Sequence, residues 1–209
     1  MKRKFLLSLA LIGSLVAAGC QTIDFKKESE AAFEEVKETS SNIKVSQMHG
    51  DLTVYDTLED VEENSEYIVQ GKLIDTKFDQ VYDGEGNPAH SRMLSTFEVY
   101  KSFKGDLKKK EKITVVEPYE VTENTFTSLE GYNKMKKNKK YTLFLFKSTK
   151  GNYVLTGVSL GKYDMENNKK AVHKDNVENY SEIEDVEYFG HEDEKFNKFK
   201  EKVKKKYNG

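Results

Sequence analysis

The chain of 209 residues has a single cysteine, Cys20, and no tryptophan. A secreted protein that used disulfides for stability would carry an even number of cysteines, so one thiol excludes an internal disulfide framework. An exposed free thiol would also be a liability outside the cell, whereas a thioether to a lipid would not. The single cysteine therefore predicts an attachment point.

Arginine is almost absent from the chain, because only Arg92 lies outside the first 19 residues. Three of the 34 basic residues, and none of the 36 acidic ones, fall in residues 1–19. The rest of the chain is therefore mildly acidic, which argues against nucleic acid as a partner. The strong preference for lysine favours an AT-rich genome, and we expect a Gram-positive bacterium.

The first residues, MKRKFLLSLALIGSLVAAGC, have the three parts of a secretory signal peptide. Lys2, Arg3 and Lys4 form a positive segment, the apolar run 5–16 follows, and small residues precede Cys20. The apolar run is shorter than the roughly twenty residues that a transmembrane helix needs. This pattern predicts export of the chain with removal of residues 1–19.

The ending AAGC resembles the lipobox of bacterial lipoproteins. The resemblance implies cleavage between Gly19 and Cys20, and a diacylglyceryl group, with palmitate-type acyl chains, on the sulfur of Cys20. Two acyl chains give stable anchoring where one is marginal. The expected location is the cell membrane, on its extracytoplasmic face. The alternative is an ordinary secretory signal that happens to end beside a cysteine.

The rest of the chain divides into a lipid anchor and tether at 20–56, a domain at 57–164 and an extension at 165–209. Within the tether, residues 25–36 carry apolar side chains at helical spacing, so either a short amphipathic helix or a solvated linker fits. A helix begins at Asp56 or Thr57, either of which can cap it, with acidic residues in the first turn. A second amphipathic helix is expected over 196–207.

Five strands are expected between these helices. Gly71 interrupts the first strand and predicts a bulge or bend. In the second strand, Met93, Phe97, Val99 and Phe103 alternate with polar residues and are expected on one face. The region 119–139 shows no β alternation. The expected strands are 67–78, 93–103, 113–117, 141–146 and 152–158, with a turn at 83–88.

This layout predicts a mainly β (α+β) fold, a five-stranded OB-like β-barrel with flanking N-terminal and C-terminal helices. The blocks EYIVQGKL, FEVYKSFKG and KNKKYTLFLF resemble the netrin and metalloproteinase-inhibitor class of OB-like domains. They resemble uncharacterised lipoproteins of Gram-positive bacteria more closely, over residues 57–164. The disulfides of the netrin class are missing, and the inhibitors use an unmodified N-terminal cysteine, so inhibition by that route is not implied.

Motifs for catalysis or metal binding fail on inspection. His191-Glu192 opens a zincin-like motif, but Lys195 occupies the position of its second histidine, which favours a solvated helix start. His49, His90 and His173 lie far apart in the sequence in polar turns, so no metal site is expected. The segment 157–163 imitates a phosphate-binding loop but is one residue short.

Two further loops have both a structural and a functional interpretation. Asp83, Glu85 and Asn87 could offer oxygens to calcium, but the loop lacks the EF-hand pattern and a hairpin turn is favoured. The lysine clusters 108–112 and 134–140 precede apolar strands, where they can guard against aggregation or contact a polyanion such as teichoic acid.

The sequence thus predicts a membrane-anchored extracytoplasmic lipoprotein that acts as a non-catalytic binding module. Its expected partners are the membrane, through the lipid anchor, and a cell-wall polymer or another protein. No cofactor, catalytic residue or ligand-binding residue is assigned. The alternatives are an enzyme acting on the envelope and an accessory subunit of an envelope complex.

Overall fold

The computed structural model describes residues 43–208. The predictions for the signal peptide, for Cys20 and for a helix over 25–36 lie outside the described residues. Within the described part the fold is mainly β, with two α-helices and two 3₁₀ turns. The elements are β1 (Lys44–Met48), α2 (Leu58–Glu63), β2 (Tyr67–Tyr82), β3 (Pro88–Lys104), β4 (Lys112–Glu117), β5 (Tyr119–Thr122), β6 (Thr125–Leu129), β7 (Lys140–Lys147), β8 (Tyr153–Leu155), η2 (Val158–Gly161), β9 (Lys162–Asp164), η3 (Tyr180–Glu182) and α3 (Asp193–Tyr207).

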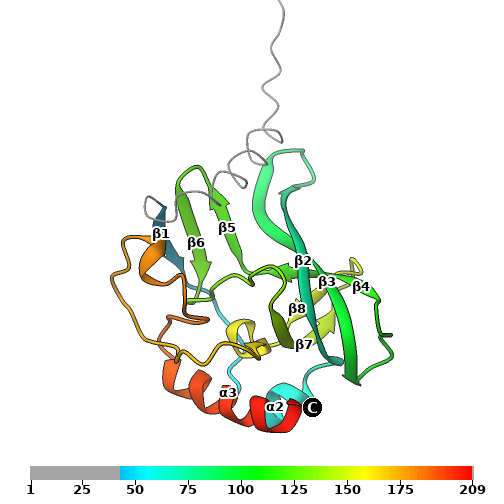
Figure 1. Cartoon of the computed structure of the whole chain (residues 1–209). Helices are drawn as coiled ribbons and strands as arrows, with labels where there is room; N and C mark the ends of the chain where they lie inside the picture. The colour runs from blue at the N-terminus through cyan, green and yellow to red at the C-terminus, as the bar shows by residue number, and fades with distance from the viewer. Residues whose placement is uncertain (1–42, 209) are drawn as a thin grey trace, which may run out of the picture.

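The larger sheet has the strand order β2-β3-β4-β8-β7-β9, and β2 pairs with β7 as well as with β3 (Figure 1). The hydrogen-bonded neighbours therefore lead from β2 through β3, β4, β8 and β7 back to β2. Strands β4 and β8 run parallel, and the other pairs are antiparallel. All five strands expected from the sequence are present. The predicted irregularity at Gly71 is confirmed by a register shift between Gln70 and Gly71.

A second sheet, with the order β1-β6-β5, lies beside the first. Two of its strands lie in the region 119–139, where the sequence predicted no β structure, and this prediction was wrong. They are four and five residues long and are joined at Glu123, whose φ of 48° makes the tight turn. Such short strands give too few alternations to be recognised.

Strand β1 lies in the stretch that the sequence assigned to a tether. It pairs in parallel with β6, in the register Lys44 to Thr125. The folded part of the chain therefore includes Ile43, which is buried. This residue lies well before the expected boundary at residue 57. A strand whose partner lies about eighty residues later has no local signal in the sequence.

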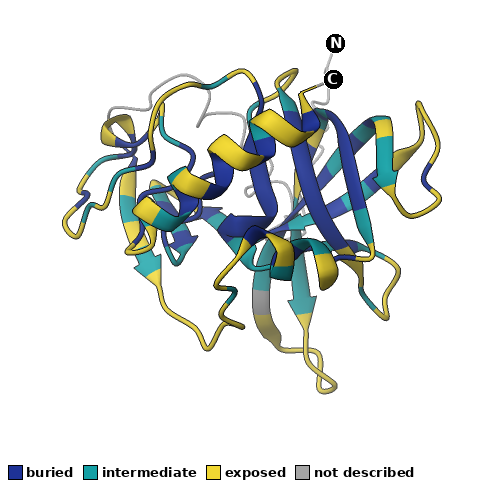
Figure 2. Ribbon diagram, turned by 90° about the horizontal axis from the view of Figure 1, so that it is seen from below, coloured by how far each residue is buried: buried dark blue, intermediate teal, exposed yellow. Residues whose placement is uncertain are grey.

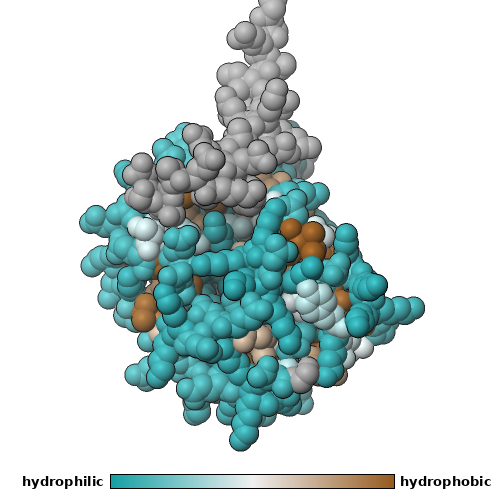
Figure 3. Space-filling model, viewed as in Figure 1, coloured by the Kyte–Doolittle hydropathy of each residue, from teal (hydrophilic) through white to brown (hydrophobic). Residues whose placement is uncertain are grey.

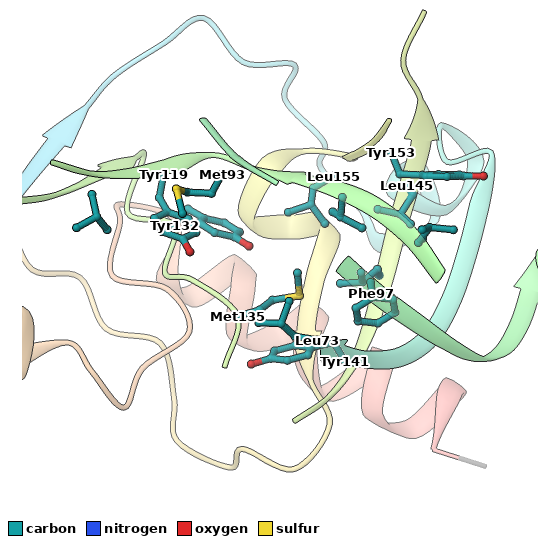
Figure 4. Packing of buried hydrophobic residues seen from close by; sticks show 14 of the residues in the cluster. Leu73, Met93, Phe97, Tyr119, Tyr132, Met135, Tyr141, Leu145, Tyr153 and Leu155 are labelled. Atoms are coloured by element: carbon teal, nitrogen blue, oxygen red, sulfur yellow. The ribbon is translucent and has the colours of Figure 1, made fainter. Parts of the chain in front are cut away.

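The buried apolar side chains form two clusters. The larger cluster extends from Tyr119 and Met93 through Leu73 and Phe97 to Tyr153 (Figure 4). Phe103 was expected to share a face with Met93, Phe97 and Val99. It packs instead on the second cluster, edge to face with Tyr207 at 4.8 Å between ring centroids.

Both expected helices are confirmed. Thr57 caps α2 in a capping box with Asp60, since each side chain accepts a hydrogen bond from the backbone N–H of the other residue. Helix α3 buries one face, including Phe196 and Phe199, and exposes the other (Figure 2). Of the helices within residues 43–208, none has the length and apolar character that crossing a membrane requires.

The segment between β9 and α3 is part of the same packed unit. Ala171, Val177, Tyr180 and Ile183 are all buried and belong to the two clusters. The C-terminal extension expected from the sequence therefore contributes to the core, and it contacts β1 through an isolated bridge between Lys44 and Asn179.

Candidate functional site

Three of the four histidines in the chain meet in one pocket at the surface. The pocket has a volume of ≈ 150 Å³ and is open to solvent. It is formed by the end of β1 and by two stretches of the C-terminal segment. Its lining residues, which we call the histidine pocket, are Val45, Gln47, His49, His173, Asp175, Val177 and His191.

His173, Asp175 and His191 are the most closely grouped residues of the pocket. Their potential ligand atoms all lie within 4.8 Å of one another. The rings of His173 and His191 have centroids 4.4 Å apart and are tilted by 35°. Nε2 of His173 lies 2.8 Å from Oδ1 of Asp175. Two imidazoles and a carboxylate therefore converge at one point that remains accessible to solvent.

His49 approaches this group from the end of β1. Its ring centroid lies 6.4 Å from that of His191. Nδ1 of His49 is 3.2 Å from Oε2 of Glu130, and the other oxygen of Glu130 accepts a hydrogen bond from Gly50 N at 2.9 Å. The Glu130 carboxylate thus engages one ring nitrogen of His49 and leaves Nε2 for another partner.

Backbone hydrogen bonds hold the segments of the pocket together. The start of β1 is bonded to the stretch before η3, and residues 172–174 run beside 188–189. These bonds join Val45 N to Glu178 O at 3.0 Å, Val172 N to Tyr188 O at 3.2 Å and Lys174 N to Phe189 O at 3.2 Å. The histidines are therefore presented by backbone that is itself fixed to the fold.

Two glycines allow the turn that carries Glu130 to lie against the residue before His191. A Cβ on Gly131 would come within 2.3 Å of the backbone N of Gly190, and Gly131 has a φ of 75°. A Cβ on Gly190 would come within 2.5 Å of the backbone O of Glu130. Only glycine fits this close approach, which brings Glu130 and His49 next to His191.

The sequence did not predict this grouping. His191 lies just before α3, as expected for a helix start. His90 lies in β3, so the expectation of a polar turn at this residue was wrong. His49 and His173 lie outside regular structure, as the expectation of polar turns required, but they are neighbours in space. More than a hundred residues separate them along the chain, so no spacing rule could join them. The one feature of the sequence that could have pointed to the pocket is that the chain has only four histidines, three of which line it.

The other candidate loops have structural roles. The carboxylate of Asp83 accepts hydrogen bonds from the backbone N–H groups of Glu85 at 2.9 Å and Asn87 at 2.8 Å, which closes the β2–β3 turn. The bond from Asn87 is the main reason that the pKa of Asp83 lies below its ordinary value. These contacts favour the hairpin interpretation over a calcium loop.

The stretch that imitates a phosphate loop contains η2 and β9 and no α-helix. Its lysine, Lys162, is buried, and its ammonium donates a hydrogen bond to the carbonyl oxygen of Asn133. Burial lowers the pKa of Lys162, and the carboxylates of Glu187 and Glu117 oppose this shift. Lys162 is therefore part of the core.

The two lysine clusters differ in their surroundings. In the second cluster, Lys136, Lys137 and Lys139 each form an ion pair with a carboxylate. In the first, Lys108, Lys109 and Lys110 line an open pocket together with Lys147. Asp106 and Glu111 also line this pocket. Lysines of the second cluster line a pocket as well, but they share it with five carboxylates, those of Asp164, Glu166, Glu184, Asp185 and Glu187.

Comparison with the models of known protein families gives no match, and comparison with curated proteins gives none either. The chemistry of the site therefore rests on its own residues. Exposed imidazoles and carboxylates can hold a cation or exchange protons with solvent, and both actions are compatible with a binding role.

Proposed function

We propose that the protein is a lipid-anchored extracytoplasmic lipoprotein whose folded part is a five-stranded OB-like barrel acting as a non-catalytic binding module. The proposal of a barrel is supported by the pairing of strands β2, β3, β4, β8 and β7, which leads back to β2. OB-like domains are small Greek-key barrels that use their exposed faces and loops for binding. The smaller sheet and α3 extend such a barrel at its sides.

The observation that carries the binding role is the histidine pocket. It gathers ionisable groups from distant parts of the chain on the surface, where they contribute little to the core. Figure 3 shows that the visible face of the molecule is mostly hydrophilic with small, scattered hydrophobic patches. Polar groups that converge on rigid backbone in a concavity are typical of a ligand site.

The anchoring role is supported by the pattern that ends at Cys20. In the native host, the wild-type protein should fractionate with the membrane and incorporate labelled palmitate. Cys20→Ala should remove the label and release the protein from the membrane fraction, whereas Ser40→Ala, outside the lipobox, should change neither. Retention of the Cys20→Ala protein in the membrane would contradict the anchor.

An anionic cell-wall polymer is a second candidate ligand, favoured by the pocket that Lys108, Lys109 and Lys110 line. Replacing these three lysines by glutamine should reduce retention on isolated cell walls, and more strongly at low salt. A matched control replaces three exposed lysines of α3, Lys198, Lys202 and Lys205, with the same change in net charge. If both variants lost the same amount of retention, the effect would depend on net charge alone, and this result would contradict a polymer site at Lys108, Lys109 and Lys110.

A further inference from the structure

We infer that the histidine pocket binds one divalent transition-metal ion, with Zn²⁺ as the best match to its ligands. His173, Asp175 and His191 supply three ligands, His49 supplies the fourth, and Glu130 orients His49. This inference rests on the proposed binding role, because it names a ligand for it. It does not depend on the anchor at Cys20.

The ligand atoms are close to the spacing of a metal site. Bonds of about 2.0–2.1 Å to Zn²⁺ place tetrahedral ligands about 3.3 Å apart. The contact of 2.8 Å between His173 Nε2 and Asp175 Oδ1 would open by about half an ångström as an ion enters between the two atoms. The spread of up to 4.8 Å across the three residues closes by small rotations of exposed side chains.

The contact between His49 and Glu130 is an independent indication. Histidines that bind metals generally donate their second ring N–H to a carboxylate or carbonyl, which fixes the ring and makes it a better ligand. Glu130 is in this position at Nδ1 of His49, and Gly50 N holds its other oxygen. Neither contact contributes to the core, because His49 is largely exposed, with 65% of its side chain accessible.

The set of ligands selects the class of metal. Imidazole suits Zn²⁺, Cu²⁺, Ni²⁺ and Fe²⁺, whereas Ca²⁺ needs six to eight oxygen ligands and Mg²⁺ an octahedron of oxygens. The pocket offers three imidazoles and one carboxylate. None of the residues that line the pocket is a cysteine, so no thiolate belongs to this set of ligands. A site of this composition discriminates strongly against Ca²⁺ and Mg²⁺.

The ligands lie in two separate parts of the fold, so a bound ion would also stabilise the folded state. His49 follows the first strand, and the other three ligands lie in the segment before α3. An ion in the pocket would cross-link β1 to the C-terminal segment across a contact otherwise made by backbone hydrogen bonds such as Val45 to Glu178. Binding to the folded state alone should therefore raise the melting temperature by several degrees at saturating metal.

The test uses the full-length protein, purified in detergent and stripped of metal with a chelator. Titration with Zn²⁺ by calorimetry should give one site per chain, and Co²⁺ should give the intense visible absorption of four-coordinate cobalt. Ca²⁺ and Mg²⁺ at the same concentrations should produce no heat and no change in melting temperature. Saturation by Ca²⁺ or Mg²⁺ would overturn the assignment.

Variants locate the site. His173→Ala and His191→Ala should each weaken Zn²⁺ binding by at least a hundredfold, whereas His90→Ala, at the fourth histidine, should leave it unchanged. Glu130→Gln keeps the bond to Gly50 N and should weaken binding by about 10- to 100-fold. If His90→Ala had the same effect as His173→Ala, or if no variant changed the affinity, the pocket would not be the site.

The possible results distinguish the proposal of a metal site from the proposal of a lipid anchor. A protein that incorporates palmitate and binds no Zn²⁺ would overturn the metal site and leave the lipoprotein proposal intact. A protein that binds Zn²⁺ through the four ligands without lipid attachment would do the reverse. An altered fold in a variant is recognised by its melting temperature without metal, which should stay within a few degrees of the wild type.

Discussion

Tyr132 donates its hydroxyl proton to a carboxylate oxygen of Glu117 at 2.7 Å, and both side chains are completely buried. Ser95 Oγ donates to the other oxygen of Glu117, and the backbone N–H of Met135 donates to the same oxygen as Tyr132 at 2.8 Å. The buried carboxylate of Glu117 in β4 thus accepts hydrogen bonds from three donors. This cluster fixes the chain after β6 against the larger sheet.

Tyr132→Phe should reduce the free energy of unfolding by about 1.5–3 kcal/mol, because it removes a hydrogen bond to a buried charged group. The ring itself remains, so its contact with the Lys162 ammonium, 4.3 Å from the ring centroid, is kept. Urea unfolding measures the change. Tyr82→Phe, at an exposed tyrosine, is the control and should stay within about 0.5 kcal/mol of the wild type.

Lys200→Met should destabilise the protein by about 3–5 kcal/mol, because it leaves the buried carboxylate of Glu187 without its partner. Burial already raises the pKa of Glu187, although Lys200 and Lys162 lower it in part. The exposed neighbour Lys198→Met is the control. The double variant Lys200→Met/Glu187→Gln should recover part of the loss, since it removes the carboxylate that Lys200→Met leaves without its ion-pair partner. A double variant no more stable than Lys200→Met would contradict this account.

Gly71→Ala should destabilise the protein by about 1–3 kcal/mol through overpacking. A Cβ at this position would come within 2.1 Å of the backbone O of Glu98 and 2.5 Å of the Phe97 ring. Gly84→Ala, in the β2–β3 turn, would meet nothing within 4 Å and should be close to neutral. Similar thermal melting of the two variants would show that the strands can move apart at Gly71 without cost.

The capping box at the start of α2 should make stability depend on pH in the acid range. Hydrogen bonds from Thr57, its side chain first and then its backbone N–H, lower the pKa of Asp60. Because the pKa is lower in the folded state than in the unfolded one, this contribution is present above about pH 4 and is lost as the pH falls through the folded value.

The measurement is the urea midpoint of the wild type and of Asp60→Asn at a series of pH values from about 6 down to about 3. The wild type should lose more stability over this range than the variant does. Parallel curves for the two proteins would mean that Asp60 contributes nothing to the acid sensitivity.

Most strands that the sequence predicted share one property, which is a run of alternating or apolar residues long enough to show a period. Strands β2, β3, β4 and β7 fall in this group, whereas β8 has only three residues and lies within the expected strand 152–158. The capped helix α2 and the amphipathic α3 have signals of their own. Strands β5 and β6 form a hairpin of very short strands, and β1 pairs with β6 from about eighty residues away. The position of β1 depends on this tertiary pairing, which no local window contains.

The histidine pocket was beyond sequence reasoning for the same reason. Its ligands come from the ends of two segments that become neighbours only when Lys44 pairs with Asn179 and Gly131 meets Gly190. A rule based on spacing detects ligands that one helix or one loop presents together. It does not detect ligands that the fold assembles from its two ends.

The parallel pairing of β1 with β6 also sets an order of events. During synthesis from the N-terminus, β1 is made before its partner β6. The pocket cannot form until His191, the last of its ligands in the sequence, has been added. A chain that stops before His191 therefore lacks the complete set of ligands. Metal uptake at this pocket would distinguish chains that contain His191 from shorter ones.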